Sequence, residues 1–137
     1  MLNLNWYNLW KYRDDANCWD YVREWMIREA KIPAEEVPRF GICPRDKNSM
    51  HAAYLEVRKG FELCEPQQFA IACSCKGRRI DHVGVVYNDQ VWHTGKTMGT
   101  QALSLKSFES LAPQTIYYIH RSLNGTAKDV QQVRRTA

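Results

Sequence analysis

The sequence contains no long hydrophobic run, no internal repeat and no low-complexity linker. No apolar stretch approaches the roughly 20 residues that a membrane-spanning helix requires. The first 15 residues are aromatic and polar, and they lack the basic start and the apolar core of a secretory signal. We therefore expect a protein made in the cytoplasm, not inserted in a membrane, with a single domain, because 137 residues suffice for a buried core.

Neither the charge nor the cysteine content indicates a specialised chain. The net charge is only +4 and the basic residues are scattered, which argues against a nucleic-acid partner. The five cysteines are an odd number in a chain without a secretion signal, so no disulfide framework is expected. Cys73 and Cys75 do not have the spacing of a zinc pair, and no second Cys/His pair stands at the usual distance. We expect free thiols, no metal and no cofactor.

The first half of the sequence shows the periodicity of helices. Asn17 has the side chain of an N-cap, and Asp20 stands at the capping-box position. The residues that follow at helical spacing are mostly apolar: Cys18, Val22, Trp25, Met26 and Glu29. Pro33 marks the end of this helix, and a second helix is expected over 49–59 before Gly60. Before them, an aromatic arm over 1–15 is expected to pack over the core.

The second half changes to the two-residue alternation that is typical of strands. Strands are expected over 69–75, 80–87, 91–94 and 115–120, and a short helical turn within 103–110. Helices followed by strands indicate an α+β fold, with N-terminal helices packed on an antiparallel sheet of about four to five strands. One domain is expected over 1–121, followed by a polar C-terminal tail over 122–137.

Two histidines fall on expected strands that a tight turn would pair. One face of the first strand is expected to hold Ile80, His82, Gly84 and Val86. His93 shares a face of the next strand with Val91, which makes it a cross-strand neighbour of His82 within hydrogen-bonding reach. Gly84 leaves room for another group to approach the imidazole.

Cys18 is expected in the first turn of its helix. A lone cysteine on the apolar side of a helix is more often a buried small hydrophobe than a nucleophile. A thiol at a helix start together with an imidazole pair has the parts of a Cys-His nucleophilic site, because both surroundings lower a thiol pKa. We interpret His51 and His120, which have no such setting, as ordinary surface or cap residues.

Three segments carry a resemblance to a known family. They are Asn-Cys-Trp-Asp-Tyr-Val-Arg at 17–23, Asp-His-Val-Gly-Val-Val-Tyr at 81–87 and Val-Trp-His-Thr-Gly at 91–95. In sequence and order they resemble the NlpC/P60 family of cysteine peptidases, most closely its phage-tail branch. The sequence departs from the family pattern at Asn17, where an aspartate is common, and at Asp20, where a small residue is often found.

The resemblance implies a papain-like fold and a mechanism. Cys18 would be the nucleophile, His82 the general base, and His93 the residue that orients His82. Backbone N–H groups at the start of the Cys18 helix would form the oxyanion hole. The family cleaves amide bonds in peptidoglycan stem peptides, commonly between D-glutamate and a diamino acid. We therefore expect a peptidoglycan hydrolase that enters a phage tail with other tail proteins and acts in the periplasm or cell wall.

Two other classes of protein fit the same residues. One is a structural or assembly protein of a phage tail that keeps the fold and has little or no activity. The other is a different Cys-His acyl-transfer enzyme, such as an acyltransferase, a transglutaminase-like protein or a secreted amidase toxin. Turnover of peptidoglycan fragments distinguishes the first class from a peptidase, and the preferred substrate distinguishes the second.

Overall fold

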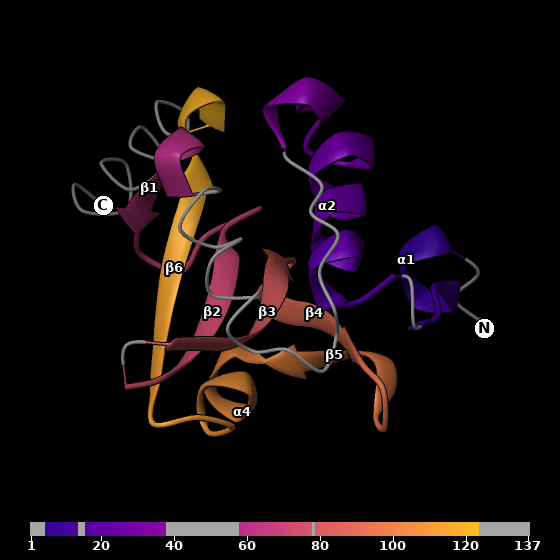
Figure 1. Ribbon diagram of the computed structural model, residues 1–137, viewed down its shortest axis with the longest axis vertical. Coiled ribbons are helices and arrows are strands. Elements are labelled where there is room, and N and C mark those ends of the chain that lie inside the picture. The colour runs from indigo at the N-terminus through magenta and orange to yellow at the C-terminus, as the bar shows by residue number, and fades with distance from the viewer. Residues whose placement is uncertain (1–4, 14–15, 38–57, 78, 124–137) are drawn as a thin grey trace.

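The computed structural model describes residues 5–13, 16–37, 58–77 and 79–123, which form a mixed α+β structure with one six-stranded antiparallel sheet (Figure 1). Its helices are α1 (Trp6–Leu9), α2 (Cys18–Arg28), α4 (Leu105–Glu109) and the 3-10 helices η1 (Ala34–Glu36) and η2 (Arg58–Gly60). Its strands are β1 (Phe61–Cys64), β2 (Ile71–Lys76), β3 (Arg79–Tyr87), β4 (Gln90–Gly95), β5 (Gly99–Ser104) and β6 (Gln114–His120).

Local sequence signals determine where α2 begins. The Asn17 side chain accepts hydrogen bonds from the backbone N–H groups of Trp19 at 3.0 Å and Asp20 at 3.3 Å. The Asp20 carboxylate accepts one from the Asn17 backbone N–H at 2.9 Å, which completes the predicted capping box. Such a cap contributes about 1 kcal/mol to helix stability. The Cys18 backbone is therefore held at the first position of the helix.

The sheet has more strands than the sequence predicted. Its order is β1-β6-β2-β3-β4-β5, so β6 lies between β1 and β2 and the chain does not form a simple meander. The expectation of four to five strands was wrong because β1 and β5 were missed. Both are edge strands, and β5 contains glycine, glutamine and serine, which have little intrinsic preference for strands. Pairing with β6 and β4 stabilises them in the extended conformation.

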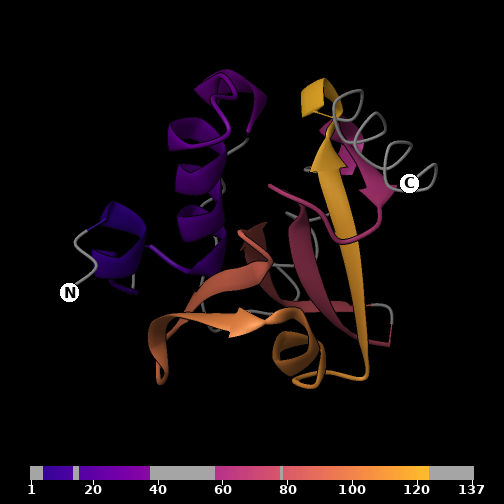
Figure 2. The same ribbon diagram turned by 180° about the vertical axis from the view of Figure 1, so that it is seen from behind.

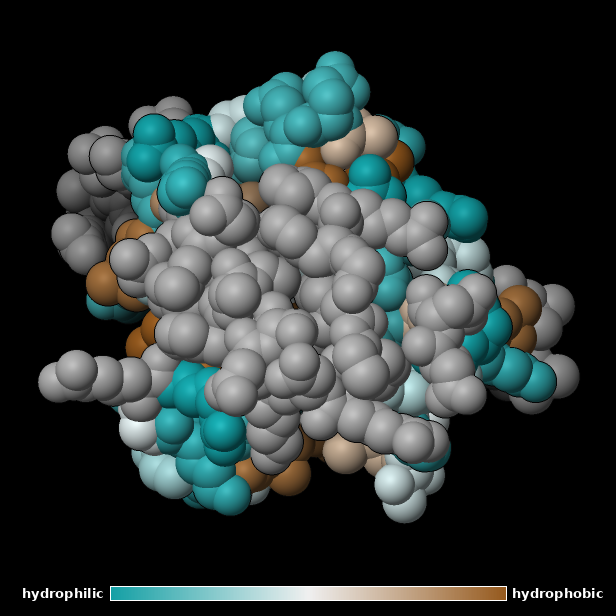
Figure 3. Space-filling view, in the orientation of Figure 1, coloured by the Kyte–Doolittle hydropathy of each residue, from teal (hydrophilic) through white to brown (hydrophobic). Residues whose placement is uncertain are grey.

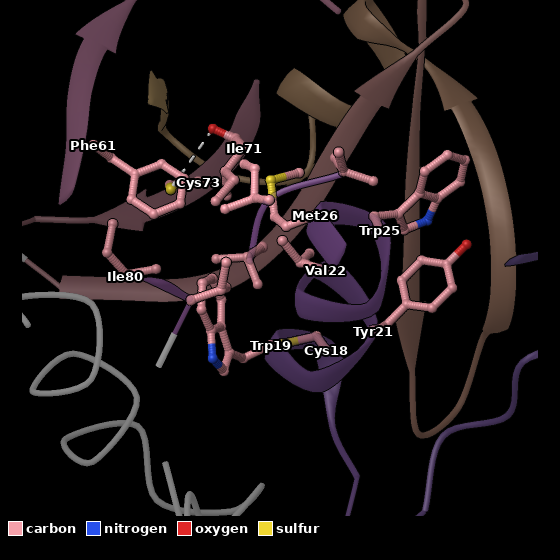
Figure 4. Close-up of a cluster of buried hydrophobic side chains, with 14 of the residues drawn as sticks. Cys18, Trp19, Tyr21, Val22, Trp25, Met26, Phe61, Ile71, Cys73 and Ile80 are labelled. Carbon is pink, nitrogen blue, oxygen red and sulfur yellow. Dashed lines mark hydrogen bonds between the residues drawn. The ribbon is translucent and has the colours of Figure 1, made fainter. Parts of the chain in front are cut away.

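The two faces of the sheet carry separate cores. On one face, α2 buries six side chains in the larger core: Cys18, Trp19, Tyr21, Val22, Trp25 and Met26 (Figure 4). The opposite face carries a smaller core: Ala70, Ala72, Val86, Val91, Phe108 and Tyr117. Phe108 belongs to α4, which lies across the central strands from α2 in both views (Figure 1 and Figure 2). The cysteines of β2 lie on the face of the larger core and Ala72 lies on the opposite face, which is the two-residue alternation of a strand.

A β-bulge changes which side chains of β3 share a face. Ser74 of β2 is the register partner of His82, whereas Cys75 is the partner of Ile80, so Asp81 is an extra residue on β3. Ile80 consequently joins the core under α2, while His82 faces α4. The prediction that Ile80 and His82 share one face was therefore wrong, because regular alternation does not continue through a bulge.

The N-terminal arm packs over the larger core, as expected. The ring of Tyr7 stacks on Trp25 at a centroid distance of 4.4 Å, and the Tyr21 hydroxyl donates a hydrogen bond to the Tyr7 carbonyl at 2.7 Å. On the face shown in Figure 3, the described residues coloured as hydrophobic form small separate patches. None of the helices within the described ranges is long and apolar enough to cross a membrane.

Three sequence predictions fall wholly or mostly outside the described residues. They concern His51, the helix over 49–59 and the tail over 122–137. Of the expected helix, only its last two residues are described, and they belong to η2. Of the tail, 122 and 123 are described, and both are helical.

Candidate active site

The structure brings His82 and His93 into direct contact. His82 Nε2 and His93 Nδ1 lie 2.9 Å apart, which is a hydrogen bond between the rings. The two residues stand on the antiparallel neighbours β3 and β4, as the alternation of the sequence predicted. Gly84 makes the approach possible, because a Cβ there would lie 3.1 Å from His93 Cβ and 2.7 Å from Val91 Cγ1. A side chain at this position would push the two strands apart.

An aromatic side chain from α4 covers the histidine pair. The Phe108 ring lies roughly parallel to His82 at a centroid distance of 6.0 Å and edge-on to His93 at 5.4 Å. Phe108 and His93 are both fully buried. This apolar contact removes water from the imidazoles, and removal of water disfavours the charged form of a histidine.

Cys18 is the first residue of α2, as predicted, and its side chain is only 6% exposed. Burial raises the pKa of its thiol to about 11, although backbone N–H groups of Val83, Trp19 and Cys18 itself partly oppose that rise. Val83 directly follows His82 on β3. The thiol therefore lies against the peptide group that adjoins one of the two predicted catalytic histidines.

The thiol does not bond to the imidazoles. Within the described ranges, Cys18 forms no hydrogen bond to His82 or to His93. The histidine pair is thus assembled, while proton transfer from the thiol would require it to turn from the Val83 amide toward His82. Catalytic hydrogen bonds often close only when a substrate is bound, so this geometry leaves the predicted roles open to test.

The protonation states of the three groups follow from burial. Burial lowers the pKa of His82 to about 4, assisted by repulsion from a charged His93. Burial also lowers the pKa of His93 to about 4. At neutral pH the site therefore holds a neutral thiol and two neutral imidazoles. A nucleophilic reaction at such a site would need transfer of the thiol proton during the reaction, since no thiolate-imidazolium pair exists beforehand.

One ring nitrogen of His82 is available for that transfer. Its Nε2 is engaged with His93, so Nδ1 is the nitrogen that can face a thiol. A neutral imidazole has one donor and one acceptor nitrogen, so His82 can take a proton at Nδ1 only when its own proton is on Nε2. The tautomer of the pair therefore determines whether His82 can act as a base.

Sequence reasoning missed two side chains that complete this cluster. Gln101 of β5 is the register partner of His93, and its Nε2 lies 3.5 Å from His93 Nε2. Phe108 was expected only as part of a helical turn. Gln101 was missed because β5 was not predicted, although the Met98-Gly99 pair after β4 is compatible with a hairpin turn.

A second polar cluster surrounds His120, which was interpreted as a surface or cap residue. His120 is 4% exposed, so it is not a surface residue. Its Nδ1 lies 2.8 Å from Ser122 Oγ and accepts a hydrogen bond from the Ser122 backbone N–H at 3.2 Å. Its Nε2 lies 3.6 Å from a carboxylate oxygen of Glu36. The hydrogen bond from the Ser122 backbone N–H is the kind that a helix cap makes, so His120 is a cap residue and not a surface residue.

The remaining thiols have no such setting. Cys73 and Cys75 are buried in the core on the α2 side of the sheet, and Cys64 is partly buried at the end of β1. Burial raises the pKa of all three thiols. In the part of the chain that the structure describes, no group of three or more His, Cys, Asp or Glu residues could hold a metal ion.

No family model, curated protein or solved structure matches the chain. The NlpC/P60 resemblance therefore rests on the three sequence segments that contain Cys18, His82 and His93.

Proposed function

We propose that the protein is a cysteine peptidase of the NlpC/P60 type, with a papain-like fold, that hydrolyses amide bonds in peptidoglycan stem peptides. The observation that carries this proposal is the 2.9 Å hydrogen bond between His82 Nε2 and His93 Nδ1. It lies beside the strand peptide that the Cys18 thiol contacts at the capped start of α2. A thiol nucleophile, a base and an orienting partner for the base are the parts that such catalysis requires.

The reaction begins with attack of Cys18 Sγ on the substrate carbonyl carbon, as the thiol proton moves to His82 Nδ1. The carbonyl oxygen becomes an oxyanion, and His82 then gives its proton to the leaving amine as the C–N bond breaks. Water next attacks the thioester, again with His82 as the base, and releases the carboxylic acid and the thiol. During these steps His93 Nδ1 would accept a hydrogen bond from His82 Nε2–H, across the 2.9 Å contact of the two rings, and hold the imidazole in place.

The N-cap determines which amide is available for the oxyanion. Asn17 takes the backbone N–H groups of Trp19 and Asp20. The N–H groups of Cys18 and Trp19 both interact with the Cys18 sulfur, and that of Trp19 is also bonded to Asn17. Once the sulfur is bonded to the substrate, the Cys18 N–H would lie close to the developing oxyanion. We therefore propose Cys18 N–H as the first oxyanion donor at this helix start.

The choice of substrate depends on the motif resemblance. The same resemblance supports cleavage of the D-glutamyl–diamino acid bond and a place in a phage tail, where the protein would meet the cell wall during entry. The net charge of +4 suits an anionic wall polymer, and this is a small contribution to the argument.

The test is turnover of purified peptidoglycan stem peptides, with the products identified by mass spectrometry. The wild type is compared with Cys18→Ala, His82→Ala and a matched control, Cys64→Ala, which removes a thiol outside the site. We expect cleavage by the wild type and the control, and loss of cleavage in the other two, with unchanged circular dichroism. The mass of the fragments identifies the bond.

Other results would contradict the proposal. A folded wild type that cleaves no stem peptide of several wall chemistries would favour a structural role in a tail. Turnover of a lipid or protein glutamine instead, still dependent on Cys18, would favour a different acyl-transfer enzyme. Equal cleavage by wild type and Cys18→Ala would exclude Cys18 as the nucleophile.

A further inference from the structure

We infer that Gln101 is a positioning residue that sets the tautomer of the histidine pair, and so decides whether His82 can accept the thiol proton. This inference rests on the proposed roles of Cys18 and His82. It concerns a residue on β5, two strands away from the base, which the three motifs do not include.

The placement of the three polar side chains follows from the sheet. His82, His93 and Gln101 stand on the adjacent strands β3, β4 and β5, and Gln101 is the direct register partner of His93. The ring nitrogens of the two histidines are 2.9 Å apart, and His93 Nε2 lies 3.5 Å from Gln101 Nε2. Both nitrogens of His93 are therefore engaged, one with His82 and the other with Gln101.

The orientation of the Gln101 amide in the structure favours a resting tautomer. Its Nε2 is a donor only, so His93 Nε2 must be the acceptor in this contact. The His93 proton then lies on Nδ1 and is donated to His82 Nε2. The single proton of a neutral His82 is consequently on Nδ1, the nitrogen that would otherwise take the thiol proton.

A rotation of the Gln101 amide by 180° would exchange donor and acceptor in both contacts, Gln101 with His93 and His93 with His82. With Oε1 toward His93, the His93 proton lies on Nε2 and is donated to that oxygen. His93 Nδ1 then accepts from His82 Nε2–H, and His82 Nδ1 presents a free lone pair. The heavy atoms of both rings stay in place, because the only change in each imidazole is which of its two nitrogens carries the proton.

Met98 holds the resting orientation. Gln101 Nε2 also donates a hydrogen bond to the Met98 sulfur at 3.4 Å, so the two amide hydrogens have two acceptors. Rotation of the amide would place its oxygen against the sulfur and lose that bond. Met98 is 48% exposed in the turn between β4 and β5, where a bound substrate or partner can displace it.

The experiment reads the tautomers directly from the ring-nitrogen chemical shifts of His82 and His93 by NMR on the full chain. In the wild type we expect His82 to be protonated mainly on Nδ1. In Gln101→Glu the carboxylate can only accept, so the proton of His82 is expected to move to Nε2. In Met98→Leu, which keeps the volume and removes the sulfur, the same shift is expected in part. Gln90→Glu, at the exposed start of β4, is the matched control and is expected to leave both rings unchanged.

Kinetics provide the second readout. Relative to Gln101→Glu, Gln101→Leu is expected to lower kcat about tenfold with little change in KM, because the interaction acts on proton transfer. If Gln101 had a purely structural role, Gln101→Glu and Gln101→Leu would both have a lower folded fraction, and the tautomers of His82 and His93 would be the same in the two variants.

The possible results separate this inference from the proposed function. Identical ring-nitrogen shifts in wild type, Gln101→Glu, Gln101→Leu and Met98→Leu would overturn the inference even if the protein cleaves stem peptides. Tautomers that follow residue 101 would uphold control of the pair by Gln101 even if no stem peptide is cleaved, in which case the proposed function alone fails.

Discussion

The two histidine clusters of this chain place similar groups in different surroundings. His82 bonds to a second imidazole on the neighbouring strand, and the proposed nucleophile, Cys18, comes from a helix far away in sequence. His120 lies 2.8 Å from a serine hydroxyl and 3.6 Å from Glu36, which has the outline of a Ser-His-Glu triad. By distance alone, the second cluster is the better nucleophilic site.

The hydrogen bonds reverse that ranking. Ser122 directs both its hydroxyl and its backbone N–H at His120 Nδ1, so two donors share one lone pair. A nitrogen that is already bonded to a backbone N–H is poorly placed to accept another proton. In the His82 cluster, Nδ1 has no such backbone donor among the described contacts. A short distance between a hydroxyl and an imidazole is therefore weaker support for catalysis than a ring nitrogen to which no backbone N–H is bonded.

The largest expected effect separates the two clusters by their nucleophiles. Cys18→Ser is expected to lower kcat at least about a thousandfold, because a serine is a much weaker nucleophile without a strong base. Ser122→Ala is expected to leave kcat within about twofold, since its hydroxyl serves a cap. Turnover of the identified stem peptide measures both. The reverse result would move the active site to His120.

The next effect compares the histidines themselves. His93→Gln is expected to lower kcat about a hundredfold with a small change in KM, because His82 loses the partner that orients it. His120→Gln is expected to lower thermal stability and leave kcat unchanged, since His120 is buried and caps the start of the following helical turn. Steady-state kinetics and thermal melts on both variants test this division. Equal loss of kcat in the two would show that the effect is structural.

A smaller effect concerns the close approach of β3 and β4. Gly84→Ala is expected to destabilise the fold by about 1 to 3 kcal/mol, because the new Cβ would stand 2.7 Å from Val91 Cγ1. Gly60→Ala is the matched control, since nothing lies within 4 Å of a Cβ there. Urea unfolding gives the free energy of unfolding of both. Comparable stability of the two variants would mean that the strands adjust without cost.

The last expected effect is a dependence of stability on pH. Burial lowers the pKa values of His82 and His93 to about 4 in the folded protein, below the ordinary histidine pKa of 6.5 that applies in the unfolded chain. The unfolded chain therefore binds protons that the folded chain does not, and the free energy of unfolding falls as the pH drops from 6.5 toward 4. Each proton contributes a slope of about 1.4 kcal/mol per pH unit. His93→Gln removes one titrating group, so a smaller slope is expected in urea unfolding across this range. An unchanged slope would show that burial of His93 does not cause it.

Much of the candidate site was accessible from the sequence because its signals are local. Asn17 and Asp20 form the predicted capping box, which places Cys18 at the helix start. The alternation around His82 and His93, with a tight turn between their strands, predicted their contact. These inferences needed only helical or two-residue periodicity and one short turn.

The parts that were wrong or missed depend on contacts between distant segments. The bulge at Asp81 is defined by pairing of β3 with β2, and no composition signal marks it. Strands β1 and β5 are weak by propensity and are extended because they pair with β6 and β4. Gln101 could not be assigned to the histidine pair until β5 was known to lie beside β4.

By itself, then, the amino-acid sequence determined the start of α2, the segments that form the four inner strands and the neighbouring placement of the two histidines. These features could be predicted because caps, periodicity and tight turns act within a few residues. Only the tertiary structure decided that β6 lies between β1 and β2, that His82 faces α4 while Ile80 faces α2, and that Gln101 closes the row. These features depend on hydrogen bonds between strands that are far apart in the chain, where the choice of partner and register is made by the whole sheet.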